Sequence, residues 1–224
     1  MRIPVSTRVL VVDDHTLVRR GTREILERRN EIRVVGEAAD GDEAVSLTDR
    51  LRPDVVLMDL GMPGLGGVEA TRQIKARWPD VEVLALTVHD DDQYLFEAIR
   101  AGASGYLLKD VHDDELIDAV LSVAEGGVVL QPAVTRRLVA GLRTRGGTLD
   151  ESPPISPLTD RELQVLKLVA KGLSNREVSE RLGLSARTVE THLSHVYQKL
   201  GASSRTEAAI RGLKEAWLNL DEIS

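Results

Sequence analysis

The sequence predicts an α/β domain with a doubly wound parallel sheet of five strands, followed by a smaller all-α domain of four helices. Two observations predict this arrangement. Short apolar runs alternate five times with segments of helical period in the first 127 residues, which is typical of a parallel sheet with right-handed crossovers. From Leu158 onward the pattern is wholly helical. A chain of 224 residues is long enough for each domain to bury its own core.

The predicted strands are short apolar runs, as expected of strands that are buried on both faces of a parallel sheet. They span residues 8–12, 33–36, 55–58, 81–86 and 105–108. The first predicted helix ends near residue 29, and the others span 42–51, 68–78, 91–101 and 115–124. Pro79, Gly102 and the pair Gly126–Gly127 follow the last three helices, where such residues commonly end a helix.

Composition narrows the classes of function. The chain has no cysteine, which excludes disulfide frameworks, thiolate zinc sites and cysteine nucleophiles. It has no apolar run of about 18 residues and no signal-peptide pattern, so we expect a cytoplasmic protein without a membrane partner. The net charge of −7 is uneven, because residues 155–224 hold ten Lys/Arg and nine Asp/Glu, which leaves −8 on residues 1–154. Only the second part is compatible with DNA.

Polar side chains follow four of the predicted strands. Asp13 and Asp14, Asp59, Thr87 and Lys109 stand at the carboxyl ends, where open α/β sheets bind their ligands. Asp59 by itself would be interpreted as a turn former. Three converging carboxylates repel one another unless a cation is present, and Mg²⁺ prefers such oxygen ligands. Lys109 supplies a charge for a phosphate oxygen and Thr87 a hydroxyl donor, so the set is suited to forming and holding an acyl phosphate.

Residues 8–126 resemble the receiver domain of a two-component response regulator, which has a flavodoxin-like fold. The resemblance is carried by the acidic pair, Asp59-Leu-Gly-Met-Pro63, Thr87 and Ala101-Gly-Ala-Ser-Gly-Tyr-Leu-Leu-Lys109. It implies that Asp59 is the phosphoacceptor. It also implies that Asp14 and Asp59 bind Mg²⁺ directly, that Asp13 binds it through water, and that the backbone carbonyl of Gly61 is a further ligand.

The resemblance assigns a role to Tyr106 as well. Thr87 and Tyr106 match the family's switch pair, in which the hydroxyl and the ring move inward together upon phosphorylation. Tyr106 could instead be an ordinary strand aromatic, half exposed at the sheet edge. His15 and His89 lie close in sequence to the acidic pair and to Thr87, but neither has a histidine partner at metal spacing. Neither is assigned a chemical role.

The predicted domain boundaries follow the composition. The receiver takes residues 1–127, and residues 128–157 form a linker in which 131–142 could be a helix. Glycine and proline gather from residue 144 to 157, which predicts an exposed connection. The all-α domain takes residues 158–224.

The all-α domain carries a helix-turn-helix pattern. Thr159 and Glu162 form a predicted capping box at the start of its first helix. A short helix over 176–182 and a turn at 183–185 precede a third helix, which ends at Gly201. One face of the third helix is apolar, formed by Val189, Leu193, Val196 and Leu200. The opposite, polar face is either simply solvated or suited to the major groove of DNA.

Residues 158–209 resemble the LuxR-type DNA-binding domain, through Leu158-Thr-x-Arg-Glu162, Gly172-Leu-Ser-Asn175, and Thr188-Val-Glu-Thr-His192 through Lys199-Leu-Gly201. The resemblance implies that residues 187–199 form a recognition helix for double-stranded promoter DNA. The predicted DNA contacts are Arg176, Arg187, Thr188, Glu190, Thr191, Ser194, His195 and Lys199, with Arg205 as a further phosphate contact. A last helix with Ala209, Leu213 and Trp217 would pair two such domains, although Trp217 could instead cover its own core.

These observations predict a response regulator of the NarL/FixJ type and not an enzyme. A sensor histidine kinase would phosphorylate Asp59, and the phosphorylated chain would form a homodimer that binds promoter DNA. One route of control is that the unphosphorylated receiver covers the recognition helix. Two other classes remain. The first is an Mg²⁺-dependent phosphohydrolase, which Gly61 disfavours because such enzymes usually have a second Asp there. The second is a phosphorylation-independent DNA-binding regulator, which the intact acidic pair, Asp59 and Lys109 disfavour.

Overall fold

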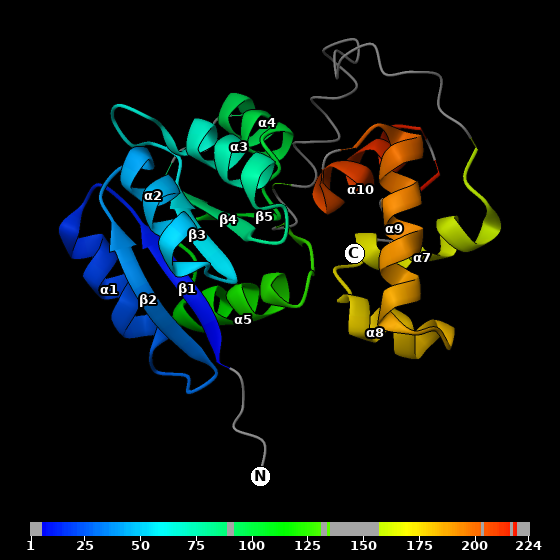
Figure 1. Cartoon of the computed structure of the whole chain (residues 1–224), viewed down its shortest axis with the longest axis horizontal. Coiled ribbons are helices and arrows are strands. Elements are labelled where there is room, and N and C mark those ends of the chain that lie inside the picture. Colours follow the sequence, from blue (N-terminus) through cyan, green and yellow to red (C-terminus); the bar gives the residue numbers. More distant parts are fainter. Residues whose placement is uncertain are drawn as a thin grey trace.

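The structure is a computed structural model that describes residues 6–88, 92–130, 134, 157–202, 204–215 and 217–218. An amino-terminal α/β domain occupies the left of Figure 1 and a helical carboxyl-terminal domain the right. His89, nearly all of the helix predicted over 131–142 and nearly all of the linker lie outside the described residues. The two predicted domain classes are both observed, while the predicted domain boundaries remain predictions.

The amino-terminal domain contains a parallel sheet with the strand order β2-β1-β3-β4-β5-β6. The strands are β1 (Thr7–Val12), β2 (Ile32–Ala38), β3 (Val55–Asp59), β4 (Glu82–Thr87), β5 (Gly105–Leu108) and β6 (Val129–Leu130). The doubly wound parallel sheet is therefore confirmed. The predicted number of five strands is wrong, because β6 adds a sixth within what was predicted to be linker. Two residues are too short for a periodic pattern, and β6 is defined only by its pairing with Gly105 and Tyr106.

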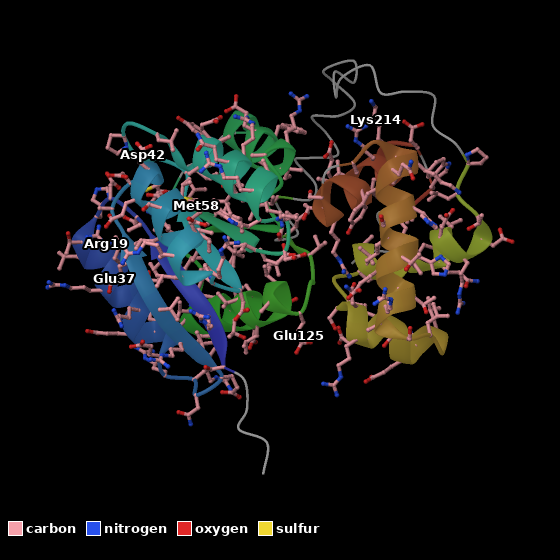
Figure 2. The ribbon with its side chains drawn as sticks, viewed as in Figure 1. Arg19, Glu37, Asp42, Met58, Glu125 and Lys214 are labelled. Carbon is pink, nitrogen blue, oxygen red and sulfur yellow. The ribbon has the colours of Figure 1, made fainter. Side chains whose placement is uncertain are left out.

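Helices cover both faces of this sheet. They are α1 (Thr16–Leu26), α2 (Gly41–Leu51), α3 (Gly67–Arg77), α4 (Asp92–Arg100) and α5 (Asp113–Ala124). Contacts place α1 and α5 together on one face, and α2, α3 and α4 on the other. Neighbouring strand residues face opposite layers, so Leu57 packs with the first layer and Met58 with the second. Figure 2 shows Met58 in the interior and the Arg19–Glu37 ion pair at the outer edge.

The carboxyl-terminal domain consists of α7 (Asp160–Ala170), α8 (Asn175–Leu182), α9 (Ala186–Leu200) and α10 (Arg205–Lys214) among the described residues. The predicted capping box is confirmed, because Thr159 accepts from the backbone N–H of Glu162 and Glu162 accepts from that of Thr159. Ser174 and Glu177 form a second capping box at α8. Gly183 and Gly201 end α8 and α9 in the left-handed conformation, which glycine adopts without strain.

Helix α10 lies between the two domains (Figure 1). Eight consecutive residues, from Arg205 to Gly212, are buried. A helix at the surface of a single domain keeps one face exposed, so α10 must be covered from two sides. Ala208 and Ala209 pack in the core of the carboxyl-terminal domain. Ile210 instead joins the receiver's apolar cluster, and Thr206 Oγ1 donates a hydrogen bond of 2.9 Å to the backbone oxygen of Ser104.

The close approach of α3 to the end of β3 predicts that Gly67 tolerates no side chain. A Cβ atom there would overlap the backbone oxygen of Asp59 and lie 2.8 Å from the Cα of Leu60. We expect Gly67→Ala to lower the free energy of unfolding by about 1–3 kcal/mol in urea denaturation, because backbone cannot yield as a flexible side chain can. Gly21→Ala, in α1 with nothing within 4 Å, is the matched control and should be neutral or stabilising by up to about 1 kcal/mol. Equal losses in the two variants would contradict this account.

Candidate functional site

Strand register brings the predicted polar residues to one edge of the sheet. Val12 is paired with Met58, so Asp13 follows its strand next to Asp59. Asp59 is paired with Leu86, and Thr87 with Leu108. The carboxyl ends of β1, β3, β4 and β5 therefore meet side by side, as predicted.

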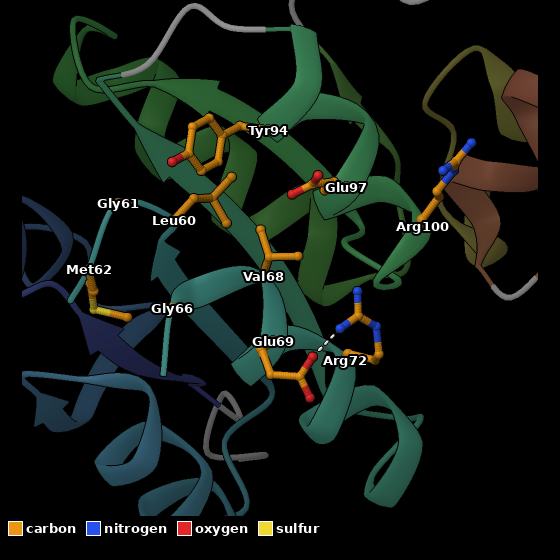
Figure 3. A pocket seen from close by; sticks show the side chains of 10 residues that line it. All are labelled: Leu60, Gly61, Met62, Gly66, Val68, Glu69, Arg72, Tyr94, Glu97 and Arg100. Atoms are coloured by element: carbon orange, nitrogen blue, oxygen red, sulfur yellow. Dashed lines mark hydrogen bonds and ion pairs between the residues drawn. The ribbon is translucent and has the colours of Figure 1, made fainter. Parts of the chain in front are cut away.

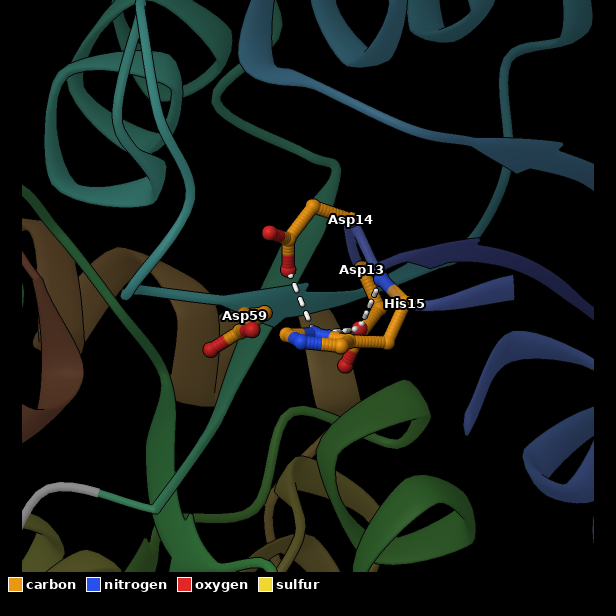
Figure 4. Close-up of side chains that lie close together, drawn as sticks. All are labelled: Asp13, Asp14, His15 and Asp59. Carbon is orange, nitrogen blue, oxygen red and sulfur yellow. Dashed lines mark hydrogen bonds and ion pairs between the residues drawn. The ribbon is translucent and has the colours of Figure 1, made fainter. Parts of the chain in front are cut away.

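Four ligand-bearing side chains converge at this edge (Figure 4). One ligand atom each from Asp13, Asp14, His15 and Asp59 can be chosen so that all lie within 4.8 Å of one another. The predicted convergence of the three carboxylates is observed. His15 is the member that sequence reasoning left out, because it was tested only against a second histidine. Its position directly after the acidic pair was the signal available in the sequence.

Lys109 joins two of these carboxylates. Its Nζ donates to Asp13 Oδ2 at 2.5 Å and to Asp59 Oδ2 at 2.7 Å. Asp13 and Asp59 are both buried, at 3% and 5% exposure, so their charges need a partner within the protein. Burial alone would lower the pKa of Lys109, but the hydrogen bonds with Asp13 and Asp59 outweigh it and raise the pKa above its ordinary value. Lys109 thus places a positive charge next to Asp59, the candidate phosphoacceptor.

The site fits a divalent cation with oxygen ligands. Asp14 Oδ1 is shielded from solvent and has no hydrogen-bond partner, an arrangement that a cation would satisfy. Asp59 Oδ1 accepts only a weak 3.1 Å hydrogen bond from the backbone N–H of Gly61. Asp13, Asp14 and Asp59 supply the hard oxygen donors that Mg²⁺ prefers, whereas the role of the Gly61 carbonyl stays a prediction.

Thr87 and Tyr106 are both buried, at 0% and 2% exposure. Tyr106 is therefore not the half-exposed edge aromatic that was the alternative prediction. Its ring lies in the apolar cluster that also contains Ile210 of α10 and Val134. The carboxyl-terminal domain thus contributes to the apolar cluster around the predicted switch tyrosine.

A solvent-open hollow of about 570 Å³ lies beside the loop that follows Asp59 (Figure 3). Residues of this loop, of α3 and of α4 line it, including Leu60, Gly61, Tyr94 and Glu97. An ion pair between Glu69 and Arg72 forms part of its wall. The hollow leaves the loop that carries Gly61 accessible from one side.

The polar face of α9 is open to solvent. Arg187, Glu190, Thr191, Ser194 and His195 are exposed, whereas the predicted apolar stripe of the same helix is buried. Arg176 on α8 is exposed too, with its Nε 3.2 Å from Glu180 Oε1. The idea that the receiver covers the recognition helix is therefore wrong for this arrangement. The receiver covers α10 instead.

Thr188 and Lys199, two further predicted DNA contacts, also have partners within the protein. Thr188 Oγ1 lies 2.8 Å from Ser185 Oγ at the start of α9. Lys199 Nζ donates at 2.7 Å to Glu162 Oε2. Burial would raise the pKa of Glu162, but hydrogen bonds from Lys199 and Thr159 hold it below its ordinary value. Lys199 therefore supports the capping box of α7.

Arg205 is not available to a DNA phosphate in this arrangement. Its guanidinium is buried and donates to Asn175 Oδ1 at 2.7 Å and to the backbone oxygen of Leu173. Burial lowers its pKa to about 10. The sequence prediction failed because a cation on a helix is expected to be exposed, and only tertiary packing buries this one.

The three residues predicted for dimerisation are engaged inside the domain. Ala209 is buried, and Leu213 and Trp217 pack against the same apolar cluster, which is centred on Leu166 and Leu200. The alternative reading of Trp217, that it covers its own core, is confirmed for this arrangement. Its role in pairing two domains stays a prediction.

Comparison with known proteins follows the two domains. Residues 9–121 match the response regulator receiver domain, and residues 156–211 match the bacterial regulatory proteins of the luxR family. The chain belongs to the two-component response regulators of the NarL/FixJ type. In this family the receiver precedes a LuxR-type DNA-binding domain, and its members regulate transcription. The described part of this response regulator has no helix long and apolar enough to cross a membrane.

Relatives cover nearly the whole response regulator. It is 40% identical to the transcriptional regulatory protein DegU of Brevibacillus brevis, over 95% of each chain. It is also 40% identical to the oxygen regulatory protein NreC of Staphylococcus carnosus, over 95% of this chain and 99% of the relative. The crystal structure of ChrA, the response regulator of a heme-sensing two-component system, is similar with 39% identity and a TM-score of 0.52. That similarity covers 96% of this chain and all of ChrA.

The position of Lys109 predicts how the affinity of the site for Mg²⁺ changes when the lysine charge is removed. We expect Lys109→Gln to tighten Mg²⁺ binding by about threefold or more in isothermal titration calorimetry, because a positive charge next to Asp13 and Asp59 is removed. Lys75→Gln changes the charge equally at the opposite edge, where Lys75 pairs with Glu82, and should leave the affinity unchanged. Weaker binding by the Lys109 variant would show that this ammonium supports the geometry of the carboxylates.

Proposed function

We propose that this response regulator is phosphorylated on Asp59 by a sensor histidine kinase, and that the phosphoryl group controls dimerisation and binding to promoter DNA. The observation that carries the proposal is the bridge from Lys109 to Asp13 and Asp59 at the carboxyl edge of the sheet. This bridge holds an ionised carboxylate ready as a nucleophile, with a cation placed for the incoming phosphoryl oxygens.

The transfer itself needs little rearrangement. A carboxylate oxygen of Asp59 attacks the phosphorus of a phosphohistidine, the new O–P bond forms as the N–P bond breaks, and the kinase histidine leaves. Lys109 then donates to a phosphoryl oxygen instead of Asp59, and the hydroxyl of Thr87 donates to another. A Mg²⁺ ion held by Asp13, Asp14, Asp59 and Gly61 supplies further positive charge when bound.

Control of DNA binding acts through α10 in this proposal. The receiver-docked form buries α10 on two sides, so the helix is not accessible to a second copy. Phosphorylation would weaken the contacts of Thr206 and Ile210 with the receiver and release α10 for pairing. The exposed face of α9 needs no uncovering, so pairing of two domains is the step under control.

Strand β5 connects the phosphoacceptor site with the contact between the receiver and α10. Its carboxyl end leads into Lys109 at the phosphoacceptor site, and its amino end follows Ser104, whose backbone oxygen accepts from Thr206. Tyr106 lies between them, in the cluster that contains Ile210. A shift of β5 would therefore move the Ser104 oxygen to which Thr206 of the docked helix donates.

Pairing matters because a single domain has few cations free for DNA. Residues 155–224 carry a net charge of only +1, and Lys199 and Arg205 are engaged within the protein. Arg176 and Arg187 remain exposed for phosphate contacts. A two-fold dimer doubles these contacts and places a second recognition helix about one DNA turn, roughly 34 Å, away.

The proposal predicts that a phosphoryl mimic changes the oligomeric state. With Mg²⁺ and beryllofluoride, light scattering should show a shift from the 24.6 kDa monomer to a dimer. Binding to a promoter fragment should tighten in the same samples, because two α9 helices then act together. Asp59→Ala should show neither change. A dimer of the same abundance in the Asp59 variant would favour the phosphorylation-independent regulator.

Release of α10 predicts a change in the distance between the domains. The chain has no cysteine, so Glu24→Cys and Arg181→Cys, both at exposed positions, can carry two spin labels without other changes. Double electron–electron resonance should give a narrow distance distribution for the resting protein and a broader or shifted one with beryllofluoride. A control pair within the receiver, Glu24→Cys with Arg50→Cys, should not respond. Dimerisation without any change in the first pair would contradict the release of α10.

A further inference from the structure

His15 lies at the candidate metal site although no function has so far been derived for it. It is the N-cap residue of α1, with an extended backbone at φ −89° and ψ 110°. Its backbone N–H donates to Asp13 Oδ1 at 2.8 Å, which ties the residue to the acidic pair. Its side chain is 70% exposed, yet the ring turns toward the carboxylates (Figure 4). Exposure alone would not favour that orientation.

The ring nitrogen and the carboxylate oxygens are spaced as ligands of one ion are spaced. His15 Nδ1 lies 2.8 Å from Asp14 Oδ1 and 3.4 Å from Asp13 Oδ1. Ligands at about 2.1 Å from an octahedral ion are roughly 3 Å apart when adjacent and about 4.2 Å apart when opposite. One ligand atom from each of the four residues lies within 4.8 Å of the others, so the set is close enough to share one ion.

The contact between His15 and Asp14 does not account for this arrangement by itself. Despite the 2.8 Å separation, Asp14 Oδ1 has no hydrogen-bond partner, so the ring N–H and the oxygen are not aligned with each other. Two donor atoms that are close but not aligned are arranged as if both faced a third atom. A cation between them is that third atom.

We propose that His15 is a nitrogen ligand of the divalent cation in this receiver, and that it shifts the site's preference from Mg²⁺ toward later transition ions such as Ni²⁺. The inference rests on the proposed cation site of Asp13, Asp14 and Asp59. Imidazole is a good ligand for Fe²⁺, Ni²⁺, Cu²⁺ and Zn²⁺, whereas Mg²⁺ prefers oxygen donors and retains water. His15 therefore acts selectively, strengthening binding of one class of ion and leaving the other nearly unchanged.

A spectroscopic experiment tests the ligand directly. Mn²⁺ is added to the full-length chain without a histidine tag, and pulsed electron paramagnetic resonance records whether a ¹⁴N nucleus is coupled to the ion. We expect ¹⁴N modulation in the wild type and its loss in His15→Asn. His112→Asn, in which the N-cap histidine of α5 is replaced, is the matched control and should keep the modulation. His89→Asn is a second control, because His89 follows Thr87 by two residues in sequence and is not the proposed ligand. It should keep the modulation also.

Calorimetry tests the selectivity. His15→Asn should weaken Ni²⁺ binding by about tenfold or more, because nickel gains far more from a nitrogen ligand than magnesium does, and should change Mg²⁺ affinity by less than about twofold. Asp59→Asn should weaken the binding of both ions. Equal losses for both ions in His15→Asn would overturn the proposal and leave His15 as a support for the carboxylates.

The outcomes separate this inference from the proposed function. Mn²⁺ that binds in an Asp59-dependent manner without ¹⁴N coupling would remove His15 as a ligand and leave the phosphoacceptor site intact. Coupling that survives in His15→Asn and disappears in His89→Asn would likewise overturn the assignment. Absence of any Asp59-dependent metal binding would overturn both the cation site and the role of His15.

Discussion

The ammonium of Lys109 holds together the carboxylates at the ends of two neighbouring strands, which would otherwise repel each other. Asp13 and Asp59 are nearly inaccessible to water, so each needs a compensating charge, and one amine serves both. Parallel pairing makes this geometry possible, because it aligns all carboxyl ends at one edge. Asp14 keeps an oxygen that is shielded from solvent and has no hydrogen-bond partner, which a bound cation would satisfy.

The contact between the domains likewise depends on one element that serves two partners. Helix α10 serves the core of its own domain with Ala208 and Ala209, and the receiver with Thr206 and Ile210. Because the helix is buried from Arg205 to Gly212, this stretch cannot meet another partner without leaving the first. Competition for one helix is a simple physical basis for a two-state protein, since docking on the receiver and pairing with a second copy exclude each other. It also explains how α9 can be exposed while the domain remains unpaired.

Local features were predictable from the sequence because they depend on neighbours within a few residues. Short continuous apolar runs located the first five strands, and the Thr159–Glu162 spacing predicted a capping box that is present. Ser174 and Glu177 have that same spacing, and the helix predicted to begin at residue 176 begins one residue earlier, with Ser174 as its N-cap. Strand β6 was not predictable, since two residues carry no period and only pairing with β5 defines it.

The sequence by itself determined which residues stand at the ends of the strands, and therefore the chemistry that Asp13, Asp14, Asp59 and Lys109 can perform. Tertiary structure decided how the charges are used: that Lys109 bridges two carboxylates, that Arg205 is buried and that α10 is covered by the receiver. These outcomes depend on residues 30 to 102 positions apart along the chain. No local pattern encodes such a distance, because side chains of the same type are equally suited to solvent until another element packs against them.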